Sequence, residues 1–296
     1  MRVVVTGREG QVVRSLIERG ALAGLTIIPL GRPTFDLAGP SDVIAAAIAA
    51  EAPDVIVSAA AYTAVDKAES ERDLAFAINE QGSRAIAIAA RDAGVPLIHL
   101  STDYVFDGSG DRPYAETDAT APSGAYGASK LAGEEAVLEC QPNSAILRTA
   151  WVYSPFGSNF VKTMLRLAGD RDEISVVADQ RGNPTSALDI ADGVLAVARN
   201  LHAASDSSLR GLFHMSGAGE ASWAEFAEAI FAVSKEVGGP TARVKQIATS
   251  DYPTAAKQPA NSRLNTDKLA GAHGVRLPEW RQSLKDVVTR LLEQGA

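Results

Sequence analysis

The first half of the chain alternates short apolar segments with longer segments that have helical spacing. The apolar segments are rich in β-branched residues and too short for helices, so they predict buried strands at residues 3–6, 26–30, 54–58, 96–101 and 145–149. The alanine-rich segments between them predict helices at residues 10–20, 41–51, 71–93 and 124–139. Because strands that alternate with helices pair in parallel and are covered on both faces, we expect an α/β fold with a doubly wound parallel sheet of Rossmann type.

The pattern changes after Trp151. Helices are predicted at residues 159–167, 186–198, 222–237 and 280–293, with a short strand at residues 174–177. The helix at 222–237 opens with a capping box formed by Ser222 and Glu225, whereas residues 238–265 are expected to be irregular. We therefore expect a Rossmann domain of residues 1–155 and 186–215, and a smaller C-terminal α/β substrate lobe of residues 156–185 and 216–296.

Two glycines, Gly7 and Gly10, lie between the first predicted strand and the first predicted helix. Glycine lets the backbone turn tightly and approach a pyrophosphate, which then lies at the positive N-terminus of the helix. Val13 stands where a third glycine commonly lets helix and strand pack closely. A plain strand-to-helix turn would also fit two glycines, but the N-terminal βα context favours a dinucleotide site.

The second predicted strand ends at Pro29-Leu30-Gly31-Arg32-Pro33, without the carboxylate that commonly binds the adenosine ribose. A cation at this place suits a 2′-phosphate, so Arg32 favours NADPH over NADH as the cofactor, with NADH left open. The alternative is that Arg32 is a solvated surface residue. Asp36 lies further along and is expected near the adenine.

Tyr126 and Lys130 are four residues apart in a predicted helix and therefore project from one face of it. That spacing alone is common by chance, but Thr102 directly follows the fourth predicted strand, at the sheet edge where ligands of doubly wound folds bind. Reduction of a ketone by hydride needs a proton donor, and a free tyrosine has a pKa of about 10. A neighbouring Lys130 ammonium would stabilise the phenolate, and Thr102 would donate to the same substrate oxygen. The combination indicates a ketone reductase.

Composition and charge exclude several other classes. The 296 residues carry a net charge of −8, which opposes binding to nucleic acid but allows a small anionic substrate. A single cysteine, Cys140, predicts no disulfide, and four scattered histidines predict no metal site. No apolar segment approaches the roughly 18 residues of a membrane span, and no signal-peptide pattern precedes the first strand. We therefore expect a cytoplasmic protein that binds neither membranes nor nucleic acid.

Several segments are shared with one known family. They are Gly7-Arg8-Glu9-Gly10-Gln11-Val12, AYTAVDKAE at residues 61–69, STDYVF at 101–106, YGASKLAGE at 126–134, RTAWVY at 148–153, DQRGNPT at 179–185 and NSRLNT at 261–266. The chain resembles the dTDP-4-dehydrorhamnose reductase family of extended short-chain dehydrogenases over essentially its whole length. AYTAVDKAE and NSRLNT are much more specific than the fold motifs. The resemblance implies hydride transfer from NAD(P)H to C4 of dTDP-4-dehydro-L-rhamnose.

The resemblance also implies roles for individual residues. Thr102, Tyr126 and Lys130 would form the catalytic triad. Together with the turn and strand-end residues named above, the expected cofactor site comprises Gly7, Gly10, Gln11, Val12, Arg32, Asp36, Leu37, Ala60, Ala61, Tyr62, Tyr126 and Lys130. The expected substrate site comprises Thr102, Asp103, Trp151 and Arg263. Some relatives form a metal-bridged dimer through acidic side chains; the first helix here offers Arg14, Ser15, Glu18 and Arg19, so we expect no metal and leave a homodimer open.

Three alternatives remain at this stage. A sugar-nucleotide dehydratase or epimerase would use the same fold, but dehydratase relatives have Thr-Asp-Glu where this chain has Thr102, Asp103 and Tyr104. A reductase of another dTDP-4-keto-6-deoxysugar would show much the same motifs. A non-catalytic subunit, such as the regulatory subunit of methionine adenosyltransferase, shares the fold, and the complete Thr102, Tyr126 and Lys130 set argues against it.

Overall fold

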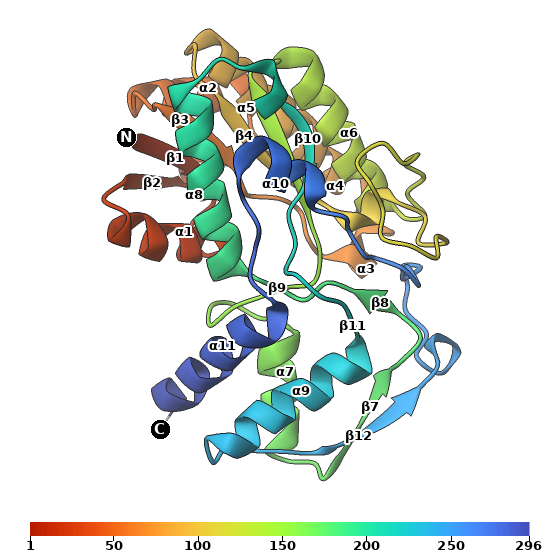
Figure 1. The fold of residues 1–296 in the computed structure, drawn as a ribbon. Coiled ribbons are helices and arrows are strands. Elements are labelled where there is room, and N and C mark those ends of the chain that lie inside the picture. Colours follow the sequence, from red (N-terminus) through yellow and green to blue (C-terminus); the bar gives the residue numbers. More distant parts are fainter. Residues whose placement is uncertain (296) are drawn as a thin grey trace.

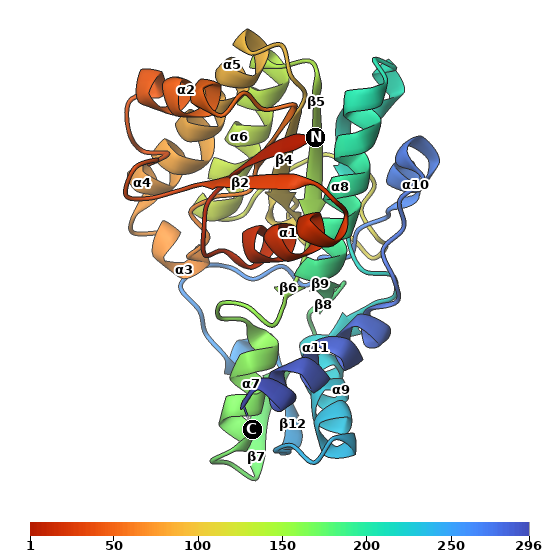
Figure 2. The ribbon, with the colours of Figure 1, turned by 90° about the vertical axis from the view of Figure 1, so that its left-hand side faces the viewer.

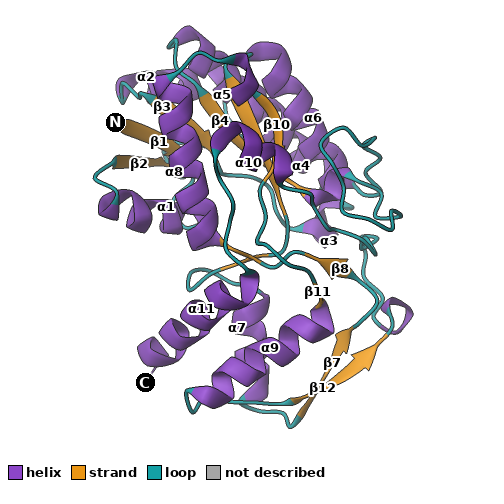
Figure 3. Ribbon diagram, in the orientation of Figure 1, coloured by secondary structure: helices purple, strands orange, loops and turns teal. Residues whose placement is uncertain are grey.

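Six parallel strands form the central sheet of the larger lobe (Figures 1 and 3). The computed structural model describes residues 1–295. Across the sheet the strands run β2 (Thr26–Leu30), β1 (Arg2–Thr6), β3 (Val55–Ser58), β4 (Leu97–Thr102), β5 (Ser144–Thr149) and β10 (Gly211–His214). The order reverses between β1 and β3, so the chain winds outward in both directions from this pair. The predicted doubly wound fold is confirmed.

Helices cover both faces of the sheet because its strands are apolar on both sides. Val3 and Val5 point to one face, where they pack with α1 (Gln11–Leu22) and α8 (Ala187–Ala203), the two helices that lie side by side in Figure 1. Val4 points to the other face and packs with α2 (Ser41–Ala50), α5 (Ser83–Asp92) and α6 (Ala125–Cys140). This alternation along β1 follows from the period of two residues in a strand.

The helix predicted at residues 71–93 is interrupted. It consists of α4 (Arg72–Phe76), a π-helical segment at Ala77–Gly82 and α5, and it is preceded by the short α3 (Val65–Ala68). A π segment turns the following side chains relative to a regular α-helix and often occurs at functional sites. Here it carries Asn79, which is buried.

The smaller lobe has its own core (Figure 2). Helices α7 (Phe160–Ala168), α9 (Trp223–Glu236) and α11 (Trp280–Gly295) pack beside a parallel pair of strands, β7 (Glu173–Val177) and β12 (Arg243–Ile247). The capping box of Ser222 and Glu225 is present and opens α9. The prediction of irregular structure throughout residues 238–265 is wrong at β12. This strand reads Arg-Val-Lys-Gln-Ile and is largely exposed, so it lacks the buried apolar pattern used to find strands.

Short elements connect the two lobes. β6 (Val152–Tyr153) pairs with β9 (Thr185–Ser186), and β8 (Arg181–Gly182) pairs with β11 (Ala221–Ser222). Helix α10 (Asp267–His273), which had not been predicted, places Leu269 in the core of the larger lobe beside α8. The exact division of the chain between the lobes stays a prediction.

Within the described residues, no helix combines the length and the apolar character needed to cross a membrane.

The close approach of α6 to the π segment provides a test. A Cβ at Gly133 would overlap the backbone oxygen of Asn79, whereas a Cβ at Gly271, in α10, would meet nothing within 4 Å. We expect Gly133→Ala to lower the free energy of unfolding by roughly 1–3 kcal/mol through overpacking. Gly271→Ala should raise it by roughly 0.5–1 kcal/mol, since alanine is the better helix former. Urea unfolding of both variants measures the contrast, and equal effects would contradict the packing described here.

Candidate active site

The turn after β1 meets the loop after β3 at the point where the strand order reverses. Gly7 has a φ of 102°, which favours glycine, and a Cβ at this position would lie 3.1 Å from Cγ2 of Val13 and 3.5 Å from Cβ of Ala60. Val13 thus fills the space beside a glycine that has no side chain, which explains how the turn tolerates it. The Thr6 hydroxyl accepts hydrogen bonds from the amides of Ala59 and Ala60, both at 3.0 Å, and fixes the two segments together.

The N-terminus of α1 is suited to an anion. Gly10 precedes the helix without a side-chain cap, and the first turn contains no acidic residue. The early amides, those of Gln11 and Val12 among them, therefore face an open helix end with its positive dipole. The Gln11 side chain points elsewhere: its Oε1 accepts from Ser154 Oγ at 2.8 Å and from Asn159 Nδ2 at 3.0 Å.

The end of β2 packs against the same turn. A Cβ at Gly31 would lie 3.2 Å from the carbonyl carbon of Gly7 and 3.0 Å from Cγ of Arg8, so any larger residue would press on the turn. Arg8 and Arg32 are both exposed and stand on these touching segments. Asp36 is also exposed and accepts from the Ala38 amide at 3.0 Å, while Leu37 is buried. Arg8 was not singled out in the sequence, although it stands inside the glycine turn.

Asn79 joins the loop at residues 60–62 to α6. Its Oδ1 accepts from the Tyr62 amide at 2.8 Å, and its Nδ2 donates to the Tyr62 carbonyl at 3.1 Å and to Ser129 Oγ at 2.9 Å. Ser129 in turn donates to the Tyr126 carbonyl at 2.8 Å. The loop at residues 60–62 is therefore held against the helix that carries Tyr126. Sequence reasoning missed Asn79, whose one signal is a polar residue four positions after the buried Ala75.

Thr102, Asp103 and Tyr126 come together at the carboxyl end of β4. The Thr102 hydroxyl donates to Asp103 Oδ1 at 3.0 Å and also lies beside the Tyr126 phenol. Burial raises the pKa of Tyr126 to about 12; Thr102 opposes this rise, and the charge of Asp103 adds to it. Burial also raises the pKa of Asp103 to about 6. Asp103 Oδ2 is buried and receives no well-formed hydrogen bond from the described residues, so it can accept one from a ligand.

Lys130 lies one helical turn after Tyr126 and is only 3% exposed. Its Nζ donates to the Leu100 carbonyl at 2.7 Å. Burial lowers the pKa of Lys130 to about 8, and the Glu134 carboxylate, one turn further along, opposes the shift. The structure thus brings the three expected catalytic residues together at the carboxyl end of the central strand β4.

The remaining expected substrate residues are held by other contacts. The Trp151 ring stacks on Trp223 from α9, with centroids 3.6 Å apart, and joins the two lobes. The Arg263 guanidinium binds Glu220 at 3.1 Å, the Asp111 carbonyl at 2.6 Å and Asn261 Oδ1 at 2.8 Å. Its expected contact with a nucleotide therefore stays a prediction.

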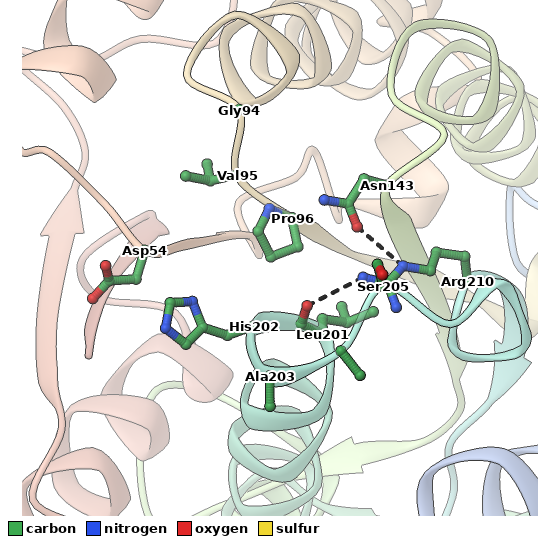
Figure 4. Close-up of a pocket in the computed structure, with 11 residues that line it drawn as sticks. Asp54, Gly94, Val95, Pro96, Asn143, Leu201, His202, Ala203, Ser205 and Arg210 are labelled. Atoms are coloured by element: carbon green, nitrogen blue, oxygen red, sulfur yellow. Dashed lines mark hydrogen bonds between the residues drawn. The ribbon is translucent and has the colours of Figure 1, made fainter.

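A hollow of about 450 Å³ lies at the opposite end of the sheet (Figure 4). It is lined by residues that precede β3, β4 and β5, such as Asp54, Pro96 and Asn143, and by Arg210. Arg210 donates to Asn143 Oδ1 and to the carbonyls of Asp206 and Leu201, so each of its three nitrogens already has a partner within the protein. Because ligands of this fold bind at the carboxyl ends of the strands, we place no chemistry here.

Known proteins match the whole chain. Residues 1–293 fit the family model described as RmlD substrate binding domain. A protein of Sinorhizobium fredii named dTDP-4-dehydrorhamnose reductase is 54% identical over 295 residues, which cover 100% of this chain and 99% of that protein. The Escherichia coli K12 protein of the same name is 42% identical, with 100% of each chain covered. A crystal structure of the Bacillus anthracis dTDP-4-dehydrorhamnose reductase in complex with NADP matches with a TM-score of 0.90 at 37% identity, covering 98% of this chain and 99% of that one.

The buried carboxyl of Asp103 predicts a pH dependence of stability. Its pKa rises from 3.8 to about 6 on folding, so between these values the folded protein keeps a proton that the unfolded chain loses. Ionisation therefore costs stability as the pH rises from 4 to 6, by up to about 3 kcal/mol at 1.36 kcal/mol per unit. Asp103→Asn keeps the Oδ1 acceptor for Thr102 but cannot ionise. We expect its free energy of unfolding, measured in urea at pH 4 and 7.5, to lack this loss; an unchanged pH dependence would contradict the assignment.

Proposed function

The chain belongs to the dTDP-4-dehydrorhamnose reductase family, and we propose that it reduces the C4 keto group of dTDP-4-dehydro-L-rhamnose to dTDP-L-rhamnose with NADPH. The observation that carries this proposal is the convergence of Thr102, Tyr126 and Lys130 at the carboxyl ends of the strands, beside an uncapped helix N-terminus. A cytoplasmic location and a homodimer stay predictions. Neither a nucleic acid nor a membrane has a part in the proposed reaction.

The residues around β1 and β2 fit a phosphorylated dinucleotide. Gly7 and Gly31 let the glycine turn and the end of β2 pack closely together, and the amides after Gly10 would hold the pyrophosphate. Arg8 and Arg32 would flank the 2′-phosphate, Asp36 and Leu37 the adenine, and Ala60, Ala61 and Tyr62 the inner half of the cofactor. When bound, NADPH supplies the hydride that reduces C4. The Bacillus anthracis relative was crystallised with NADP.

Tyr126 would donate its phenolic proton to the C4 oxygen of the substrate. A phenol with a pKa near 12 gives up its proton only if the phenolate is stabilised as it forms. The Lys130 ammonium, one turn away, supplies positive charge, and the Thr102 hydroxyl would turn from Asp103 Oδ1 to donate to the C4 oxygen. Asp103 Oδ2 offers a buried acceptor for a sugar hydroxyl, and Trp151 offers a flat apolar surface for the sugar.

Tyr104 opposes the dehydratase alternative. It stands where dehydratase relatives have a glutamate, its hydroxyl donates to Gln258 Oε1 at 2.5 Å, and burial raises its pKa far above the ordinary value. It therefore supplies no base for attack on a ring carbon.

The assay that separates the candidates adds dTDP-4-dehydro-L-rhamnose and follows NADPH absorbance together with the sugar product. Matched NADPH oxidation and dTDP-rhamnose formation support the reductase; a changed sugar without NADPH consumption indicates an epimerase, and no turnover with tight partner binding indicates a regulatory subunit.

Removal of the Tyr126 hydroxyl tests the proton donor. We expect Tyr126→Phe to lower kcat by roughly 10²–10⁴-fold, the usual contribution of a positioned acid, because the aromatic ring remains and only the proton-donating hydroxyl is lost. NADPH binding, followed by nicotinamide fluorescence, should change little and serves as the control. A variant that turns over at the native rate would remove Tyr126 from the mechanism.

The two arginines near Gly31 test cofactor choice. Arg32→Ala and Arg8→Ala should each lower the ratio of kcat/KM for NADPH to kcat/KM for NADH by about tenfold, because each removes a charged partner of the 2′-phosphate. Arg199→Ala, which removes an exposed arginine of α8, is the matched control and should leave the ratio unchanged. If both variants keep the native ratio, these side chains do not bind the 2′-phosphate.

A further inference from the structure

Most of the hydrogen-bonding capacity of the Lys130 ammonium is used inside the protein. An ammonium has three N–H donors and no acceptor. One donor is directed at the Leu100 carbonyl, 2.7 Å from Nζ, and a second faces His99 Nε2, 3.4 Å from Nζ. One N–H therefore remains for a ligand, and its direction is determined by the other two.

The contact with Lys130 determines which nitrogen of His99 carries the proton. Because the ammonium can only donate, His99 Nε2 must accept, and the proton of the neutral ring lies on Nδ1. Nδ1 is 3.1 Å from Ser58 Oγ, which can accept that proton's hydrogen bond. Burial, together with the charge of Lys130, lowers the pKa of His99 well below its ordinary value, so the ring stays neutral. His99 and Ser58 are each 1% exposed.

We propose that His99 is a positioning residue for Lys130, and that Ser58 holds the imidazole ring in place by accepting a hydrogen bond from its Nδ1–H. The three residues come from α6, β4 and β3, and Ser58 immediately precedes the loop expected to line the cofactor. His99 thereby links the direction of the lysine to the position of that loop. The importance of this link for turnover rests on the role of Lys130 in the proposed function.

Other groups near Lys130 remain unchanged when His99 is replaced. Glu134 faces it from α6, but this carboxylate is paired with buried Arg148 of β5 through two bonds of 2.8 and 2.6 Å. Tyr126 lies one turn earlier on the same helix, and Asp103 lies beside that phenol. A difference between variants at position 99 therefore reports the His99 contact.

The tautomer can be tested on the unmodified protein. Nitrogen-15 NMR of the histidine rings should show His99 as the neutral Nδ1–H form from pH 5.5 to 7, where Lys130 is still protonated, with no titration near the ordinary pKa of 6.5. A neutral Nε2–H form, or titration in this range, would overturn the proposal. This measurement needs no turnover and is therefore independent of the proposed function. Failure to reduce the dTDP sugar would contradict the proposed function and leave the tautomer of His99 unaffected.

Two substitutions then test the effect on Lys130. His99→Leu fills the space but cannot accept, so the pKa of Lys130, followed by carbon-13 NMR of the lysine Cε, should fall by about one unit. The apparent pKa of the alkaline limb in the pH profile of kcat/KM should fall by the same amount. At pH 8.5 we therefore expect kcat/KM to be about tenfold lower than in the native protein, with a raised KM for NADPH. His99→Gln has an amide oxygen that can accept the hydrogen bond from Lys130. It should therefore bring both the Lys130 pKa and the alkaline limb of kcat/KM most of the way back to their native values. His202→Leu, at an exposed histidine of α8, is the control.

A purely structural role for His99 would give another result. Both variants would then unfold more easily while the Lys130 pKa and the alkaline limb stayed at their native values, and the proposal would be wrong. If His99→Leu fails to fold, Ser58→Ala provides the second variant. It removes the acceptor of the Nδ1–H and leaves the ring held less firmly, so the Lys130 pKa should fall by part of the His99→Leu shift while the ring keeps its Nδ1–H form; an unchanged Lys130 pKa would exclude Ser58 from the arrangement.

Discussion

The candidate site depends on how closely α6 approaches the backbone on either side of it. A Cβ at Gly127 would overlap the Tyr104 carbonyl oxygen, and a Cβ at Gly133 would overlap that of Asn79. These two glycines allow the helix to sit deep between the loop after β4 and the π segment. Tyr126 and Lys130 lie on the helix between these contacts, so their separation from Thr102 is set by backbone packing rather than by flexible side chains.

Burying charged side chains along α6 costs desolvation free energy, and the buried groups are compensated for it to different extents. Arg148 and Glu134 are each 2% exposed and neutralise one another through a bidentate pair. Burial lowers the pKa of Lys130 to about 8, because the ammonium has no carboxylate partner and only a carbonyl and a neutral imidazole replace its lost hydration. An ammonium with this pKa titrates close to neutral pH, as would suit the role proposed for Lys130 beside Tyr126.

The fold could be predicted where burial leaves a clear pattern. Strands β1, β3, β4 and β5 are buried, whereas β2, the edge strand, is only partly buried; the predicted bounds of all five agree with the structure within a residue. β12 was missed because its residues are mostly exposed, and the π segment because one turn of π-helix has no distinctive sequence. The motifs predicted Thr102, Tyr126 and Lys130, which the structure brings together. Asn79 and His99 could not be assigned because their partners, such as Ser129 and Ser58, lie 50 and 41 residues away in the sequence.

Gln11 is required at its position for two separate reasons. Its backbone belongs to the helix end that suits a pyrophosphate, and its carboxamide binds Ser154 and Asn159, where the chain enters the smaller lobe. A shift of the glycine turn is therefore transmitted to α7, whose first turn Asn159 caps. The glycine turn and the orientation of the smaller lobe are thus coupled through one side chain, and a substitution tolerated by either would still have to satisfy the other.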